Sequence, residues 1–255
     1  MDISLLPDLA WLALLLFARL GTLFMLMPGI GEQTVPVRVR LTMALATLLV
    51  VYPTMSGVLP PVPQSAVEVF GLILWEILIG LGLGLGLAVR FVLSVMQVAG
   101  TTIAFQMGLG FALNVDPSQG TQGVLLGNFL ALLGMTLIFI ADLHHLALAG
   151  IVRSYDVFSV GSAIPIGDFT QYALMSAAKA FEVAIQISAP FMVFGLIFYL
   201  GLGILSRLMP QLQIFMIAMP VNILGGFILL AAMLSALMAL YIDHVRQVML
   251  VLFPS

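Results

Sequence analysis

The residues of this chain best suited to chemistry lie together at Asp142, His144 and His145. Imidazole and carboxylate groups bind metal ions and relay protons. On a helix, however, neighbouring residues point about 100° apart, so two adjacent imidazoles do not readily hold one ion. Zinc takes three or four ligands, and the next histidine, His244, lies far along the chain. We therefore expect a polar cluster at a helix end, in which Asp142 and His145 can hydrogen-bond. We expect no metal site, no cofactor and no enzymatic activity.

Charged side chains inside apolar runs are the second kind of reactive residue. Arg19 lies at the centre of the first run, Glu76 lies inside the third, and Arg90 joins the third to the fourth. A charge at the centre of a bilayer costs about 3 kcal/mol or more, so each needs a partner, water or surroundings other than lipid. Burial against other helices or subunits and a role in transport both stay open. Lys179 and Glu182 are three residues apart and are expected to pair on one helical face.

Residues 104–123, AFQMGLGFALNVDPSQGTQG, cannot form an ordinary membrane helix although apolar runs lie on both sides. Gly108 and Gly110 loosen the backbone, and the residues after them are typical of a turn: Asn114, Asp116 and Pro117. Irregular backbone at membrane depth is tolerated only inside protein or along a water-filled path. The stretch therefore predicts a conduit.

The composition requires a membrane environment around the elements that position these residues. The 255 residues are 62% hydrophobic and only 7% charged, and the mean hydropathy is +1.23. A soluble domain carries roughly 25% charged residues. A span needs about 20 residues, so about six or seven helices fit. The net charge of -3 predicts no nucleic-acid partner, and the lack of cysteine excludes disulfides and thiolate metal sites.

The apolar runs predict an all-α protein of the multi-helix membrane type, with broken helices and helical hairpins. They cover residues 9–27, 41–52, 67–89, 91–113, 124–149, 172–206 and 214–242. Pro190 and Pro220 lie within the last two runs and are expected to kink or divide them. Residues 152–170 are predicted to be a loop. Because its start has no basic residue and Arg19 interrupts it, the first run is interpreted as a retained helix, not a signal peptide.

Glycines alternate with leucine in the third run, at Gly80, Gly82, Gly84 and Gly86. On a helix these form two pairs four residues apart on nearly opposite faces, where other helices can approach closely. The alternative is a flexible hinge, since each glycine lowers helix stability by about 1 kcal/mol.

Four segments together resemble the FliR/SctT family of type III secretion export-gate subunits, in matching order over nearly the whole chain. The segments are Phe17-Ala18-Arg19 with Met27-Pro28-Gly29-Ile30-Gly31, Val35-Pro36, Arg38 and Arg40; residues 76–80 and the glycines after them; residues 104–108 with 117–120; and residues 205–213 continuing to Pro220.

The resemblance implies one domain, residues 1–255, built into a helical hetero-oligomer. A FliP-like part would cover about residues 1–180, and a FliQ-like helical hairpin about residues 181–245. The hairpin would consist of residues 181–207 and 213–245, turning at Met209-Pro210-Gln211. It also implies one copy per gate, with FliP, FliQ and FlhB homologues as partners and unfolded flagellar proteins in transit. The chain would be a multi-pass protein of the bacterial inner membrane, and the assembled gate would stand largely above the membrane on the periplasmic side.

The resemblance further implies that residues 105–122 form a plug in the closed pore. We expect Phe111 to close it, with apolar support from Phe105, Met107 and Leu109. The remaining predicted plug residues are Gln106, Gly108, Gly110, Asn114, Asp116, Pro117 and Gln119. In such an assembly six charged residues would be buried or would contact other subunits: Arg19, Glu76, Arg90, Lys179, Glu182 and Arg207.

The alternative function is a secondary transporter or small-solute channel that works alone, since broken helices and intramembrane charges also mark those proteins. Against it, the chain has no internal repeat and no polar cluster at one midplane site. A membrane enzyme built on His144 and His145 would lack a third ligand or a nucleophile.

Overall fold

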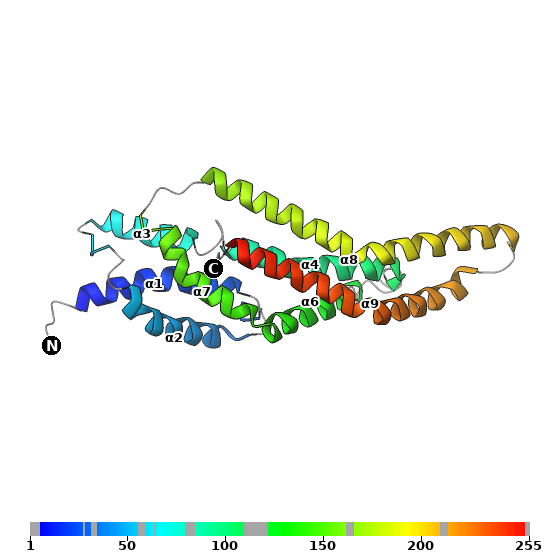
Figure 1. Cartoon of the computed structure of the whole chain (residues 1–255), viewed down its shortest axis with the longest axis horizontal. Helices are drawn as coiled ribbons and strands as arrows, with labels where there is room; N and C mark the ends of the chain where they lie inside the picture. Colours follow the sequence, from blue (N-terminus) through cyan, green and yellow to red (C-terminus); the bar gives the residue numbers. More distant parts are fainter. Residues whose placement is uncertain are drawn as a thin grey trace. The chain divides into compact units, whose positions relative to one another are not determined.

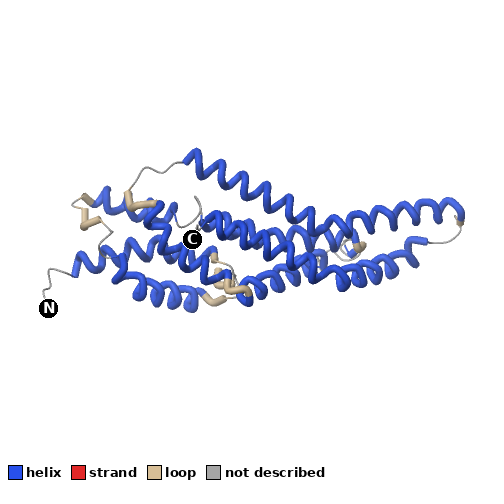
Figure 2. The backbone as a smooth tube through the Cα atoms, in the orientation of Figure 1, coloured by secondary structure: helices blue, strands red, loops and turns tan. Residues whose placement is uncertain are grey.

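Almost every described residue is helical in the computed structural model, and the described segments contain no strand. The described residues are 6–27, 29–31, 35–55, 60–63, 65–79, 85–109, 122–161, 166–209 and 214–252. Figure 2 shows that helices make up nearly all of these segments and that loops are short between them. The prediction of an all-α membrane-type fold is confirmed.

The described part of the chain contains eight helices. They are α1 (Leu6–Leu26), α2 (Val37–Met55), α3 (Ala66–Leu78), α4 (Leu85–Gln106), α6 (Gln122–Ile140), α7 (Leu143–Val157), α8 (Ile166–Leu208) and α9 (Ile214–Leu252). Four of them, α1, α2, α8 and α9, contain stretches long and apolar enough to cross a membrane.

Two expected assignments are wrong, and both errors have the same cause. Residues 152–157 belong to α7 and residues 166–170 to α8 instead of one loop, and Arg90 lies inside α4 instead of between two helices. α4 begins at Leu85, so Arg90 continues a helix. Hydropathy drops at a polar residue, but arginine favours helix well. Hydropathy alone therefore placed these ends at the wrong residues.

Proline does not divide the long helices. Pro190 lies within α8 and Pro220 within α9, and Pro53 lies near the end of α2. Proline removes one backbone hydrogen bond and normally kinks a helix. In apolar surroundings, however, leaving the helix would free many more backbone groups. Each of the two long apolar runs is therefore one helix.

The chain divides into two compact units, described here separately. The first contains residues 1–91, 142–177 and 248–255, and the second contains residues 92–141 and 178–247. The division into a FliP-like and a FliQ-like part stays a prediction.

In the first unit, α1 packs against both α2 and α3. The end of α1 is shaped by two glycines: Gly29 has a φ of 79°, and the Gly31 amide donates to the carbonyl of Met27 over 2.8 Å. A Cβ on Gly31 would lie 2.4 Å from the carbonyl oxygen of Met25. The chain can therefore turn this closely only with glycine there.

In the second unit, α4 and α6 touch backbone to backbone. A Cβ on Gly100 would lie 2.6 Å from the Cα of Gly127, and a Cβ on Gly127 would lie 3.0 Å from the carbonyl oxygen of Gln97. About two turns further along α6, Gly134 faces the ring of Tyr241 from α9. Small residues thus let these helices approach closely, as in membrane helix pairs.

Candidate functional site

A buried ion pair joins α1 to α3 in the first unit. The side chains of Arg19 and Glu76 are both fully buried. Nε of Arg19 donates to Oε2 of Glu76 over 2.6 Å, and a terminal nitrogen donates to Oε1 over 3.1 Å. This two-point contact matches the planar fork of a guanidinium to a carboxylate. Both charges are thus buried between helices of the single chain, and their role in the gate stays a prediction.

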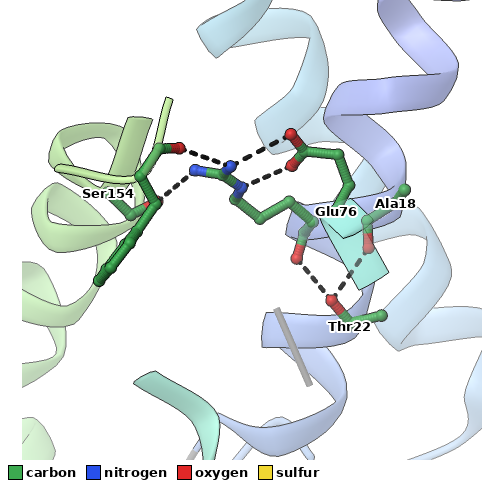
Figure 3. Close-up of polar contacts among 6 residues, drawn as sticks. Ala18, Thr22, Glu76 and Ser154 are labelled. Carbon is green, nitrogen blue, oxygen red and sulfur yellow. Dashed lines mark hydrogen bonds and ion pairs between the residues drawn. The ribbon is translucent and has the colours of Figure 1, made fainter. Parts of the chain in front are cut away.

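A third helix, α7, contacts the other side of the same guanidinium. Arg19 donates to the hydroxyl of Ser154 over 3.2 Å and to the carbonyl of Phe158, just past the end of α7, over 2.9 Å. Figure 3 shows Glu76 and Ser154 on opposite sides of the guanidinium, with Thr22 bonded to the α1 backbone below it. Four of the five donors of Arg19 are therefore used within the protein.

Aromatic rings enclose the ion pair. The guanidinium carbon of Arg19 lies 3.8 Å from the ring centroid of Tyr155 and 5.4 Å from that of Trp75. Both distances are within the range of a cation–π interaction. Burial raises the pKa of the Glu76 carboxyl while the charge of Arg19 opposes the rise, and burial also raises the pKa of the Tyr155 hydroxyl. The cluster can hold three helices in register.

The last turn of α4 forms a second polar site, in the second unit. Met107 is fully buried, and a Cβ on Gly226 of α9 would lie 2.4 Å from its Cγ. Gly108 has a φ of 80°, which ends the helix. Its amide donates to the carbonyl of Phe105 over 3.1 Å. The segment predicted to be a plug therefore begins at a tightly packed turn.

A buried amide from α9 is bonded to this turn. Nδ2 of Asn222 donates to the carbonyl of Gln106 over 3.2 Å and lies 3.4 Å from the hydroxyl of Tyr199 in α8. The side chain of Gln106 covers Gly195 of α8, where a Cβ would lie 2.5 Å from Oε1. Three helices thus meet around the end of α4.

Comparison with known proteins decides the family. Residues 10–248 match the model of the bacterial export proteins, family 1. The flagellar biosynthetic protein FliR of Caulobacter vibrioides is 37% identical over 239 residues, which cover 94% of each chain. That of Bacillus subtilis is 32% identical over 88% of this chain and 86% of its own. The Yop proteins translocation protein T of Yersinia pestis is 25% identical over 92% of this chain and 89% of its own.

The chain belongs to the bacterial export proteins, family 1. The relatives named above are a flagellar biosynthetic protein and a protein of Yop translocation. This export protein is therefore a component of a bacterial protein-export system, as the four resembling segments implied.

Only part of the predicted plug falls within the described residues. In this part, Phe105 is 54% exposed, Gln106 and Leu109 are half-buried, and Met107 and Gly108 are buried. The others lie outside the described residues, and so do three of the four alternating glycines: Gly110, Phe111, Asn114, Asp116, Pro117, Gln119, Gly80, Gly82 and Gly84. Gly86 lies within α4. The roles of all of these residues stay predictions.

The other predicted charge sites of this export protein lie at its surface. Lys179 contacts Glu182 over 3.0 Å, as expected, but both side chains are about half exposed. Arg90 and Arg207 are exposed as well. For these four residues a contact with another subunit stays a prediction, since the single chain does not bury them.

The group of Asp142, His144 and His145 brings three possible ligand atoms within 4.8 Å of one another. An ion bound at about 2.1 Å requires ligand atoms no more than about 4.2 Å apart. The centroids of the two imidazole rings lie 4.0 Å apart, and the rings are tilted by 37°. Asp142 lies 3.6 Å from Nδ1 of His145, which suits an ion pair better than a hydrogen bond. This geometry does not favour a shared ion.

Sequence reasoning missed several residues of the two sites, among them Ser154, Tyr155 and Asn222. Ser154 and Tyr155 were overlooked because their segment was taken for a loop. Asn222 carried a usable signal, because a polar residue inside a run of spanning length is expensive and needs a partner.

Proposed function

We propose that this chain is the FliR-type subunit of a flagellar type III export gate, which conducts unfolded flagellar proteins out of the cytoplasm. The family match over residues 10–248 and the similarity to FliR of Caulobacter vibrioides over 94% of both chains support this function. The gate is a passive conduit in this proposal, and its energy comes from partner proteins and the proton gradient.

Residues 105–122 act as the plug of the closed gate in this proposal. The observation that carries it is the end of α4, where Gly108 stops the helix while Met107 is packed against Gly226. The chain beyond Leu109 therefore leaves from a firmly held point. Phe105 is exposed and can face a pore, whereas Met107 supports the plug from the core. Phe111 closes the constriction, and an apolar constriction resists water and ions.

In this proposal, FliP, FliQ and FlhB homologues surround the subunit. Each gate contains one copy of it. Its exposed apolar surface supports a place within a larger assembly in the inner membrane. Only 17% of the spanning stretch of α2 and 22% of those of α8 and α9 are buried within the chain. Apolar faces of that size need protein or lipid to cover them.

The plug is tested by deleting residues 110–119 and, separately, by Phe111→Ala. Both variants should raise ion conductance through the assembled gate, the deletion more strongly, because the apolar constriction is removed. Conductance is measured in a planar bilayer with purified complexes, and the yield of complex serves as the assembly control. A fully assembled deletion variant with unchanged conductance would rule out the plug.

Copurification tests membership of the gate. A tagged chain expressed with its FliP-like and FliQ-like partners should be isolated as one complex, because its apolar faces are covered there. A stand-alone transporter would instead purify alone as a stable protein in detergent, and that result would contradict the proposal.

A further inference from the structure

Asn222 is an unusual residue for its position in the fold. It lies in the apolar helix α9, and its side chain is only 2% exposed. Its Oδ1 has no hydrogen-bond partner among the described residues. A buried polar group without a full set of partners costs stability. An apolar side chain of similar size has no donor, so the hydrogen bonds of the amide are what asparagine adds at this position.

The amide supplies a donor where the end of α4 needs one. The last carbonyls of a helix have no partner within the helix. Nδ2 of Asn222 donates a hydrogen bond to one of them, the carbonyl of Gln106, over 3.2 Å. The same nitrogen lies against Gly108, where a Cβ would approach it to 3.1 Å and where φ is 80°. Glycine therefore allows both the turn and the approach of the amide.

We propose that Asn222 is a positioning residue of the export gate: held between the Gln106 carbonyl and the Tyr199 hydroxyl, it fixes the last turn of α4 and so the point from which residues 110–121 leave. The inference rests on the proposed function, since it assigns an anchor to the proposed plug. Asn222 and the residues that it contacts all belong to the second unit: Gln106, Gly108 and Tyr199.

Thiol labelling measures this anchoring directly, because the natural chain contains no cysteine. Met107→Cys places a probe directly after α4, and Ile103→Cys places one a turn earlier, inside the helix; both positions are fully buried. In the assembled gate, Asn222→Ala should raise the maleimide labelling rate at position 107 by about five- to tenfold, the effect expected for one lost hydrogen bond. The rate at position 103 should not change.

Three further variants sharpen the comparison. Asn128→Ala removes an exposed asparagine of α6 and should leave labelling at position 107 unchanged. Tyr199→Phe removes only the contact of 3.4 Å and should change the rate by at most about twofold, since so long a bond is weak. Asn222→Leu removes the donor while keeping the volume of the side chain, so it is the second variant if Asn222→Ala fails to assemble, and it should also raise labelling at position 107. Unchanged labelling at 107, or an equal rise at 103, overturns the proposal.

Conductance separates the anchor from the plug. If both proposals hold, Asn222→Ala raises the ion leak, and adding this change to the deletion of 110–119 raises it no further. If the deletion leaks and Asn222→Ala does not, the anchor is wrong and the plug stands. If the deletion does not leak, the plug is wrong, and the labelling rates at position 107 still decide whether Asn222 fixes the end of α4.

Discussion

At position 19, a guanidinium lies inside an apolar helix and finds all its main partners within the protein. Two of its bonds go to a carboxylate from α3, and two go to α7 and the residue after it. A buried ion pair adds little stability compared with an apolar pair of the same volume, because both charges lose their hydration. Its value lies in selecting which helices meet, since any other arrangement leaves a buried charge without its partner.

Removing one half of this pair should be far more harmful than removing both. Glu76→Ala leaves the Arg19 charge buried, and we expect it to lower the free energy of unfolding by about 3–5 kcal/mol. Arg19→Met combined with Glu76→Met should recover much of this loss. Denaturant titration in detergent measures the difference.

The exposed pair Lys179 and Glu182 provides the matched control. Glu182→Ala should cost no more than about 1 kcal/mol, because the remaining lysine is half exposed and its long side chain can extend to polar surroundings. An equal cost for Glu76→Ala and Glu182→Ala would show that the buried pair is not a helix-selecting contact.

The ring and the hydroxyl of Tyr155 are expected to contribute differently to stability around Arg19. The ring lies 3.8 Å from the guanidinium carbon, whereas the hydroxyl is buried without a hydrogen-bond partner among the described residues. Tyr155→Phe should therefore be neutral or slightly stabilising. Tyr155→Leu should lower stability by about 2 kcal/mol, because the cation–π contact is lost. Thermal unfolding in detergent compares them, and a larger loss for phenylalanine than for leucine would contradict this interpretation.

At the scale of elements, glycine decides how closely the helices pack. The crossing of α4 and α6 at Gly100 and Gly127 brings the two backbones into contact. Other glycines have open space around them, as at Gly201 in α8. The same residue type is thus required at one helix and replaceable at another.

Substitution by alanine should reveal this difference. Gly100→Ala and Gly127→Ala each force the backbones apart and should cost about 1–3 kcal/mol. Gly201→Ala meets nothing and should be neutral or stabilising by up to about 1 kcal/mol, since alanine favours helix more than glycine. Resistance of the purified chain to denaturant and to protease ranks the three variants. Equal stability of all three would contradict the close crossing.

For the whole molecule, the distribution of apolar surface determines how the chain behaves outside the gate. Large apolar side chains such as Leu200, Ile204 and Leu224 are more than half exposed. Charge is sparse throughout the chain. An isolated copy therefore depends on lipid or detergent to cover α2, α8 and α9.

Expressed without partners, the chain should remain in the membrane pellet after washing with high salt and with alkaline carbonate. The hydrophobic contact that holds it there is not screened by ions and does not depend on the pH, whereas an electrostatic attachment would be weakened. Immunoblots of pellet and supernatant measure the partition. Release of most of the protein by either wash would contradict an integral association.

Hydropathy and residue type are local properties, so the sequence by itself determined the all-α class, the membrane character, most helices and, through four segments, the family. It did not determine the ends of α4 and α7, where polar residues continue a helix.

The contacts of Arg19 depended on tertiary structure alone, because Glu76 and Ser154 are 57 and 135 residues away in the chain. The meeting of Asn222 with Gln106 over 116 residues is of the same kind. A buried polar group announces that it needs a partner, but only the packing of helices decides which of the distant candidates reaches it.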